Sequence, residues 1–166
     1  LVDCLSREFS GTEISVLLHG VNPQIERFCA DRGISYRRIY EDADSGLDAY
    51  AGFDLHVGYR VHGHVSALKR AIPSYLLEQD GRGCDYGLTI ERRVSVPAYL
   101  PAGRRRSSTW RSRLVGGVQC PSLASIDQAM ALVGLDRKHD FEKFIGLERQ
   151  LRCFKHSCYE RFFELP

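Results

Sequence analysis

The chain has 166 residues, of which 43% are hydrophobic and 27% charged, and its formal net charge at pH 7 is +2. This length and composition fit one globular domain with a sizeable core. No run approaches the roughly 18 apolar residues of a membrane span, and so small a net charge makes no electrostatic case for nucleic acid. We therefore expect no membrane span, no nucleic-acid partner and a cytoplasmic location, with attachment to a membrane surface as an alternative.

The first half of the chain alternates strand and helix patterns. The sequence predicts helices over residues 2–9, 47–51 and 62–71, a further helix from Pro23 to the stop at Gly33, and strands over residues 14–18, 35–40, 54–59 and 74–78. Asn22 and Pro23 suit the N-cap and first position of their helix. Because the chain opens at Leu1 inside a helix pattern, we expect it to be part of something longer.

This alternation predicts an α/β fold: a Rossmann-like parallel sheet flanked by helices, with a long C-terminal helix. We expect a single domain in which residues 1–91 form the core, residues 92–124 form an Arg-rich loop or insertion, and residues 125–166 form helices packed on that core. Ser125 would cap the first of these helices. Residues 141–163 carry an apolar stripe for the second.

The segment 92–126 contains seven arginines, no acidic residue and three prolines. A solvated mobile loop is one interpretation. The other is a binding surface for an anionic sugar chain, a lipid diphosphate or a partner domain, with Trp110 stacking on a sugar ring.

Six cysteines are scattered along the chain without a C-x-x-C pair, which favours free thiols in a reducing compartment. Cys29 and Cys158 fall on apolar helix faces. A helical spacing separates Cys158 from Cys153 and His156, so we expect no zinc site there.

Polar residues follow the predicted strands at His19-Gly20, Tyr40-Glu41, Arg60 to Gly63 and Gln79 to Arg82. In parallel sheets, ligands bind beyond the carboxyl ends of the strands, near the place where the strand order reverses. We expect these four loops to share one rim.

Two of these loops suggest chemistry. Arg60 leaves a strand and His62 begins a helix, where free N–H groups and a guanidinium suit a carboxylate or phosphate. Gly63 allows the backbone to approach a ligand, and His62 can exchange protons near neutrality. In the next loop, Asp80 and Arg82 would face them across the rim.

The alternative is structural: Arg60 pairs with an acid such as Asp80, and His62 only caps its helix. His64, two residues further on a helix, is expected to face elsewhere in a structural role. His19 is an outlying candidate, and His56 is expected to pack within the sheet.

The run D-L-H-V-G-Y-R-V-H-G, the A-L-x-x-x-I-P pattern after it and Asp80-x-Arg82 resemble the C-terminal domain of the polysaccharide pyruvyl transferase family. The resemblance is clearest over residues 54–87. It implies a GT-B-type arrangement of two Rossmann-like domains and transfer of a pyruvyl group from phosphoenolpyruvate to a sugar of a cell-surface polysaccharide.

Carried over, Arg60 would hold the donor's carboxylate or phosphate and His62 would be the acid or base. Asp80 and Arg82 lie where the family often has an Asp-x-Arg loop and would contribute to substrate binding. Gly63 and His19 are further candidates for substrate binding because of their positions after strands. The scheme needs no metal and no redox cofactor. The chain has no room for the N-terminal domain of the family, so a missing domain or partner subunit would have to complete the acceptor site.

Two other functions stay open. One is a GT-B glycosyltransferase domain that binds a nucleotide sugar, although no acidic residue or base-stacking pocket for the nucleoside is evident. The other is a non-catalytic module that binds sugar or phosphate, which the short length favours.

Overall fold

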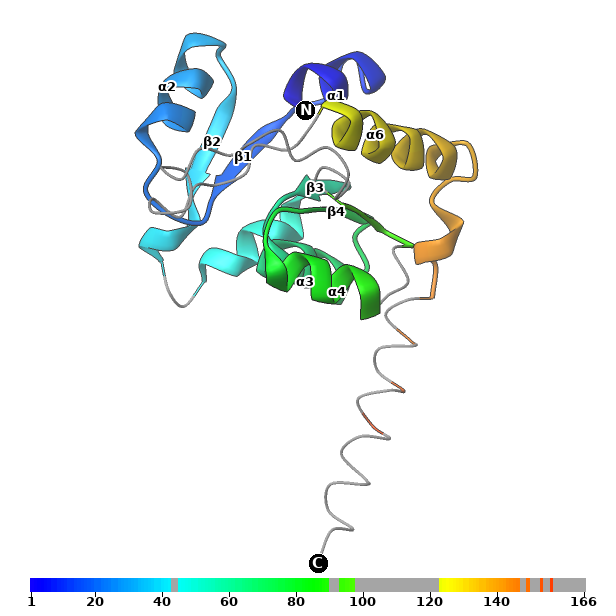
Figure 1. Cartoon of the computed structure of the whole chain (residues 1–166). Coiled ribbons are helices and arrows are strands. Elements are labelled where there is room, and N and C mark those ends of the chain that lie inside the picture. Colours follow the sequence, from blue (N-terminus) through cyan, green and yellow to red (C-terminus); the bar gives the residue numbers. More distant parts are fainter. Residues whose placement is uncertain are drawn as a thin grey trace, which may run out of the picture. The chain divides into compact units, whose positions relative to one another are not determined.

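The computed structural model describes residues 1–42, 45–89, 93–97 and 123–146, together with residues 149, 153 and 156. It is an α/β protein with parallel sheets flanked by helices, which confirms the predicted fold class (Figure 1). The chain divides into two compact units, Leu1–Gly52 and Phe53–Pro166. The α/β core predicted over residues 1–91 spans the boundary between these units.

The N-terminal unit contains one βαβ motif. Its elements are the helix α1 (Val2–Glu8), the strand β1 (Ser15–Leu18), the helix α2 (Pro23–Asp31), the strand β2 (Ser35–Arg38) and the 3-10 turns η1 (Ile39–Glu41) and η2 (Gly46–Gly52). β1 and β2 pair in parallel, with Ser15 opposite Ser35. The predicted cap is confirmed, because the Ile25 N–H donates to Asn22 Oδ1 at 3.1 Å.

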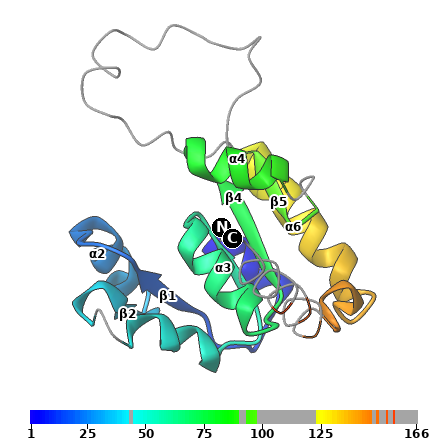
Figure 2. The same cartoon turned by 90° about the horizontal axis from the view of Figure 1, so that it is seen from below.

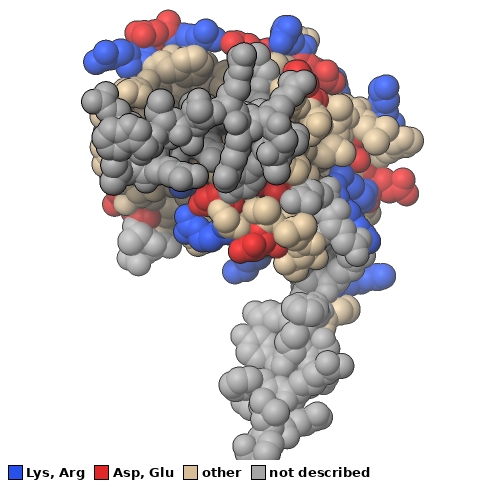
Figure 3. Space-filling model, in the orientation of Figure 1, with Lys and Arg blue, Asp and Glu red and all other residues tan. Residues whose placement is uncertain are grey.

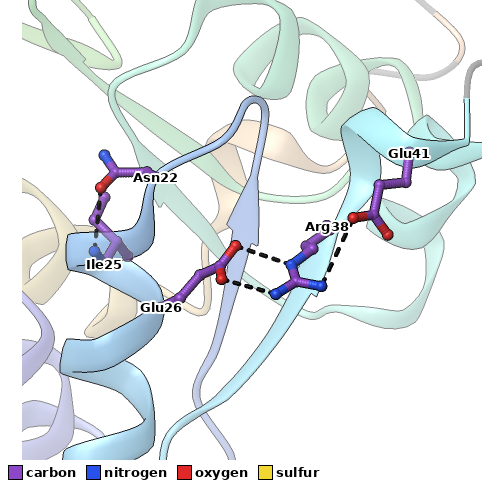
Figure 4. Close-up of polar contacts among 5 residues, drawn as sticks. All are labelled: Asn22, Ile25, Glu26, Arg38 and Glu41. Atoms are coloured by element: carbon purple, nitrogen blue, oxygen red, sulfur yellow. Dashed lines mark hydrogen bonds and ion pairs between the residues drawn. The ribbon is translucent and has the colours of Figure 1, made fainter.

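An ion-pair cluster ties α2 to the end of β2 (Figure 4). The Arg38 guanidinium donates two parallel hydrogen bonds to the Glu26 carboxylate, at 2.9 and 2.7 Å. It also lies 3.7 Å from a carboxylate oxygen of Glu41. Arg38 lowers the pKa of Glu26 through this hydrogen bond and its charge. This fork geometry orients the helix on the strand.

The core of this unit is small and is formed by Leu18, Cys29, Ile39 and Tyr50. Cys29 is fully buried on α2, as predicted. Ile25 and Phe28 of the same helix remain 38% and 37% exposed. A sheet of only two strands is too narrow to cover the side of α2 that carries these two side chains.

The C-terminal unit has three layers (Figures 1 and 2). Its elements are β3 (His56–Gly58), α3 (Val61–Lys69), β4 (Ser74–Glu78), α4 (Gly81–Thr89), β5 (Ser95–Pro97) and α6 (Leu123–Arg137). The strands form a parallel sheet in the order β3-β4-β5. α3 and α4 cover one face and contact each other, while α6 packs against β4 and β5 on the other face.

The central strand β4 is buried along its whole length. Its neighbours in the core are the apolar sides of α3 and α6, contributed by Ala67, Ile126, Ala129 and Val133. Burial on both faces explains the uninterrupted apolar run Tyr75-Leu76-Leu77. The core therefore fixes the position from which the chain leaves β4 at Glu78.

Two elements of this unit differ from the sequence prediction. The expected polar loop after Glu78 is the helix α4, because Asp80 caps it and Gly83 and Gly87 allow it to pack closely on β4. Part of the expected Arg-rich loop is the strand β5, which pairs with β4 from Leu76 opposite Ser95. The arginines between residues 98 and 122, and Trp110, for which a binding surface was one interpretation, lie outside the described residues.

The end of the chain also differs from the sequence prediction. α6 runs from Leu123 to Arg137, and the Ser125 hydroxyl donates to the Pro97 carbonyl instead of capping the helix. Phe141 has a left-handed backbone, and a 3-10 turn, η4 (Glu142–Phe144), follows it. The long helix predicted from residue 141 therefore does not begin there. Most of its remaining length, including Cys158, lies outside the described residues.

None of the helices in the described part of the chain is long and apolar enough to cross a membrane. On the described surface visible in Figure 3, basic and acidic side chains lie interspersed. This distribution agrees with the small net charge.

Candidate functional site

The candidate site is formed where β3 and β4 each run into a helix. These strands are parallel neighbours, so their carboxyl ends lie at the same edge of the sheet. The chain leaves β3 through Arg60 into α3 and leaves β4 through Asp80 into α4. Two helix N-termini therefore begin beside each other at one edge, with an arginine close to each.

The N-terminus of α3 has no side-chain cap. Arg60 occupies the N-cap position with an extended backbone and cannot accept a hydrogen bond through its guanidinium. Arg60 and His62 are exposed, whereas Gly63 is buried against the sheet. The first backbone N–H groups of α3 and its positive dipole end thus lie beside two exposed nitrogen-bearing side chains.

The N-terminus of α4 is capped by Asp80. Its Oδ1 accepts the Gly83 N–H at 2.9 Å, and its Oδ2 accepts a hydrogen bond from Arg82 at 2.9 Å. The side chain of Arg82 remains 73% exposed. The predicted Asp80-x-Arg82 pattern is therefore a capping motif with an attached ion pair.

The environment of Asp80 shows that this edge stabilises negative charge. The Gly83 N–H lowers the pKa of the Asp80 carboxyl most, followed by the hydrogen bond from Arg82. The charge of Arg60 lowers the pKa further, which places Arg60 within electrostatic reach of Asp80. Arg60, Asp80 and Arg82 are thus brought together. Among the described contacts, no hydrogen bond or ion pair joins His62 to them.

His19 belongs to the N-terminal unit, whereas Arg60, Asp80 and Arg82 belong to the C-terminal unit. It follows β1, and its Nε2 lies 2.6 Å from the hydroxyl of buried Tyr50. Burial raises the pKa of Tyr50 to about 12. The predicted single rim is not formed as one sheet edge, because the strands pair as β1-β2 and β3-β4-β5. Neither described sheet contains a reversal of strand order.

Glu78 is a residue at this edge to which the sequence analysis gave no role. It ends β4, is 0% exposed and accepts a hydrogen bond from the Ser95 hydroxyl at 2.8 Å. A Cβ at Gly87 would lie 1.9 Å from Glu78 Oε1, so the glycine makes space for the carboxylate. An acidic residue at the end of an apolar strand was the signal in the sequence that could have identified Glu78.

Two other histidines of this unit, His56 and His64, share one serine hydroxyl as a hydrogen-bond partner. His56 lies in β3, and its Nδ1 is 2.7 Å from the Ser74 hydroxyl. His64 is fully buried on α3, and its Nδ1 is also 2.7 Å from that hydroxyl. Neither residue takes part in the cluster around Asp80.

Comparisons of the chain with protein-family models, with curated proteins and with solved structures gave no match. Among the described residues, no group of three or more His, Cys, Asp or Glu side chains is arranged to hold a metal ion. The described cysteines at positions 4, 29, 84 and 153 take part in no disulfide. The chemistry of the site must therefore be argued from its own geometry.

Proposed function

We propose that the unit Phe53–Pro166 binds phosphoenolpyruvate as the donor of a pyruvyl transfer to a sugar of a cell-surface polysaccharide. The observation that carries the proposal is the Asp80 carboxylate, which accepts hydrogen bonds from the Gly83 N–H and from Arg82 at the edge where Arg60 also begins a helix. An edge that stabilises the chain's own carboxylate also favours an anionic ligand.

The uncapped N-terminus of α3 is the better position for the ligand's anionic group. Asp80 already occupies the N-terminus of α4, whereas Arg60 leaves the first N–H groups of α3 without a capping side chain. A phosphate or carboxylate there would accept backbone hydrogen bonds and pair with Arg60. Gly63 is the third residue of α3 and keeps this turn free of a side chain.

The reaction needs one proton donor and stabilisation of a leaving phosphate. A proton adds to the methylene carbon of phosphoenolpyruvate, and a sugar hydroxyl adds to the neighbouring carbon and loses its proton. The bond from that carbon to the phosphate oxygen breaks, a second hydroxyl of the sugar adds to the carbon to complete the ketal, and the proton of that hydroxyl leaves with the phosphate. We assign the proton delivery to His62 and the phosphate to Arg60, with Arg82 nearby.

A glycan acceptor would be held by a further domain or a partner subunit. Phosphoenolpyruvate is an intracellular metabolite, so the proposal also implies a cytoplasmic location. The chain alone should bind the donor weakly and show little turnover.

The test is titration calorimetry of the full chain with phosphoenolpyruvate. Arg60→Gln should weaken binding by about tenfold or more, since a charged hydrogen bond is lost. Lys69→Gln, which removes the same charge from the last turn of α3, should leave the affinity almost unchanged. No binding of phosphoenolpyruvate, or equal binding by the two variants, contradicts the proposal.

The same measurement separates the alternatives. Binding of a nucleoside diphosphate without phosphoenolpyruvate would favour the glycosyltransferase domain. Equal affinity for inorganic phosphate and phosphoenolpyruvate would favour a non-catalytic module. His62→Gln should retain binding, and it should abolish phosphate release once an acceptor-binding partner is supplied.

A further inference from the structure

The 3-10 turn η4, orange in Figure 1, is held on the sheet by a lysine. The ammonium of Lys143 forms an ion pair with the Asp136 carboxylate of α6. It also donates to the Arg93 carbonyl, just before β5, at 3.2 Å. The same ammonium lies 5.1 Å from the centre of the Tyr75 ring of β4 and 5.3 Å from that of the Phe144 ring. One cation therefore joins η4 to α6, to β4 and to the chain before β5.

The groups around this ammonium are fixed by burial and by their own contacts. Tyr75 is 1% exposed and Phe144 5%, and their rings meet edge to face with centres 5.7 Å apart. The Tyr75 hydroxyl donates to Asp136 Oδ2 at 2.5 Å. Burial and this hydrogen bond raise the pKa of Tyr75, so its hydroxyl keeps the proton that it donates. Two aromatic rings and one carboxylate thus form a cage that suits a cation.

The turn that carries Lys143 into this cage has an unfavourable backbone. Asp140 and Phe141 follow α6 with φ angles of 49° and 53°, in the left-handed region. Few residues other than glycine adopt this conformation, and for a side chain as bulky as phenylalanine it is an outlier. Their N–H groups bond to the carbonyls of Arg137 and Asp136, the pattern with which helices commonly end at a left-handed glycine. Aspartate stands here where glycine is usual, so the turn carries strain that other contacts must offset.

We propose that Lys143 is a cation latch: its occupancy of the cage offsets the strain at Asp140 and Phe141, and η4 opens as one unit when the positive charge is lost. Opening removes the Phe144 ring from Tyr75 while the sheet and α6 stay folded. None of these residues belongs to the candidate site, so the latch is independent of the proposed function.

The remaining contacts of η4 are local, which makes it a separate unit. The Phe144 N–H donates to the Phe141 carbonyl and the Ile145 N–H to the Glu142 carbonyl, both at 2.9 Å. Ile145 is 72% exposed, and the side chain of Lys143 is 33% exposed. β4, in contrast, is buried along its whole length. Local and partly exposed contacts of this kind open at a lower free energy than a core strand.

The test is amide hydrogen exchange of the full chain, measured residue by residue by NMR at increasing, low concentrations of denaturant. In the wild type, the Phe144 and Ile145 amides should exchange through an opening of lower free energy and weaker denaturant dependence than the Leu76 amide of β4. Lys143→Met removes the charge and keeps an apolar side chain, so exchange at Phe144 and Ile145 should be about tenfold faster. If η4 and β4 exchange through the same opening, or if Lys143→Met leaves exchange in η4 unchanged, the proposal is wrong.

Asp136→Asn tests the ion pair itself. Asparagine still accepts the Tyr75 hydrogen bond but lacks the charge that holds Lys143, so exchange in η4 should again be faster. Combined with Lys143→Met, its effect should be less than additive, because both changes remove one interaction. Lys138→Met removes the same charge from an exposed position after α6 and should leave exchange in η4 unchanged. Full additivity, or an equal effect of Lys138→Met, contradicts the latch.

Asp140→Gly tests the strain in the turn. Glycine adopts the left-handed conformation freely and the Asp140 side chain is exposed, so this change should slow exchange in η4 several-fold. It should also restore much of the protection that is lost in Lys143→Met. Asp140→Asn, which removes the charge and keeps a side chain, should have a smaller effect. If Asp140→Gly leaves exchange in η4 unchanged or accelerates it, the turn is not strained and the proposal is overturned.

Discussion

The carboxylate of Asp80 and the guanidinium of Arg82, two residues apart, form an ion pair with an N–O distance of 2.9 Å at the start of α4. Asp80 also accepts the Gly83 N–H, so it satisfies a helix end and an arginine at the same time. An anion that binds at this edge therefore competes with the Asp80 carboxylate for the positive charge of Arg82.

Asp80→Asn should increase the affinity for phosphoenolpyruvate. Asparagine still caps α4 through its amide oxygen, while the loss of the negative charge frees Arg82 and removes repulsion. We expect an increase of about threefold or more, reduced by solvent screening at this partly exposed site. Calorimetry at low and high salt measures the gain in affinity and its reduction by screening.

The control for that prediction is Asp85→Asn on the exposed side of α4, which should change the affinity little. A lower affinity in Asp80→Asn would show that Asp80 binds the ligand directly. The role of Asp80 as a competitor would then be wrong.

Gly87→Ala should destabilise the protein by about 1–3 kcal/mol, the usual cost of overpacking a core. The new Cβ would lie 1.9 Å from Glu78 Oε1 and 2.8 Å from Ser95 Oγ, and Glu78 is fully buried. Urea denaturation gives the free energy of unfolding. Gly81→Ala is the matched control, since a Cβ at that position meets nothing within 4 Å.

Arg38 should keep Glu26 ionised to lower pH than an ordinary glutamate. Its hydrogen bond is the main cause of the lowered pKa of Glu26, so this interaction stabilises the fold above the ordinary glutamate pKa and is lost as the pH falls through the lowered value. In Arg38→Gln, an NMR titration should place the Glu26 midpoint at higher pH. An unchanged midpoint would mean that the pair seen in Figure 4 does not form in solution.

His64 should make the fold sensitive to acid. Its pKa is about 3 in the folded chain, against an ordinary value of 6.5. Between these two values, His64 is protonated in the unfolded chain and neutral in the folded chain. The free energy of unfolding should therefore fall by up to about 1.4 kcal/mol per pH unit below about pH 6.5, through this residue alone.

His64→Asn supplies the comparison, because asparagine does not titrate in this range. Urea denaturation at about pH 7 and about pH 4.5 should show a smaller loss of stability in His64→Asn than in the wild type. Equal losses would mean that His64 is protonated in the folded protein over this range.

The sequence was sufficient for the elements that local patterns specify. β4 matches its predicted bounds because it is an apolar run ended by a charged residue, and α2 begins where Asn22 and Pro23 indicate. Arg60 was expected beside Asp80, and the neighbouring parallel strands β3 and β4 provide that placement. The roles assigned to Arg60 and His62 stay predictions.

Strand partners and close packing required the tertiary structure. A strand pattern does not say which strand it pairs with, so the division into sheets β1-β2 and β3-β4-β5 could not be read from the chain. The glycines of α4 made this segment resemble a loop in the sequence. Their role is to let the helix pack closely on Glu78, and this contact is visible only in the tertiary structure. The bond from Ser74 to both His56 and His64 likewise depends on three elements meeting at one hydroxyl.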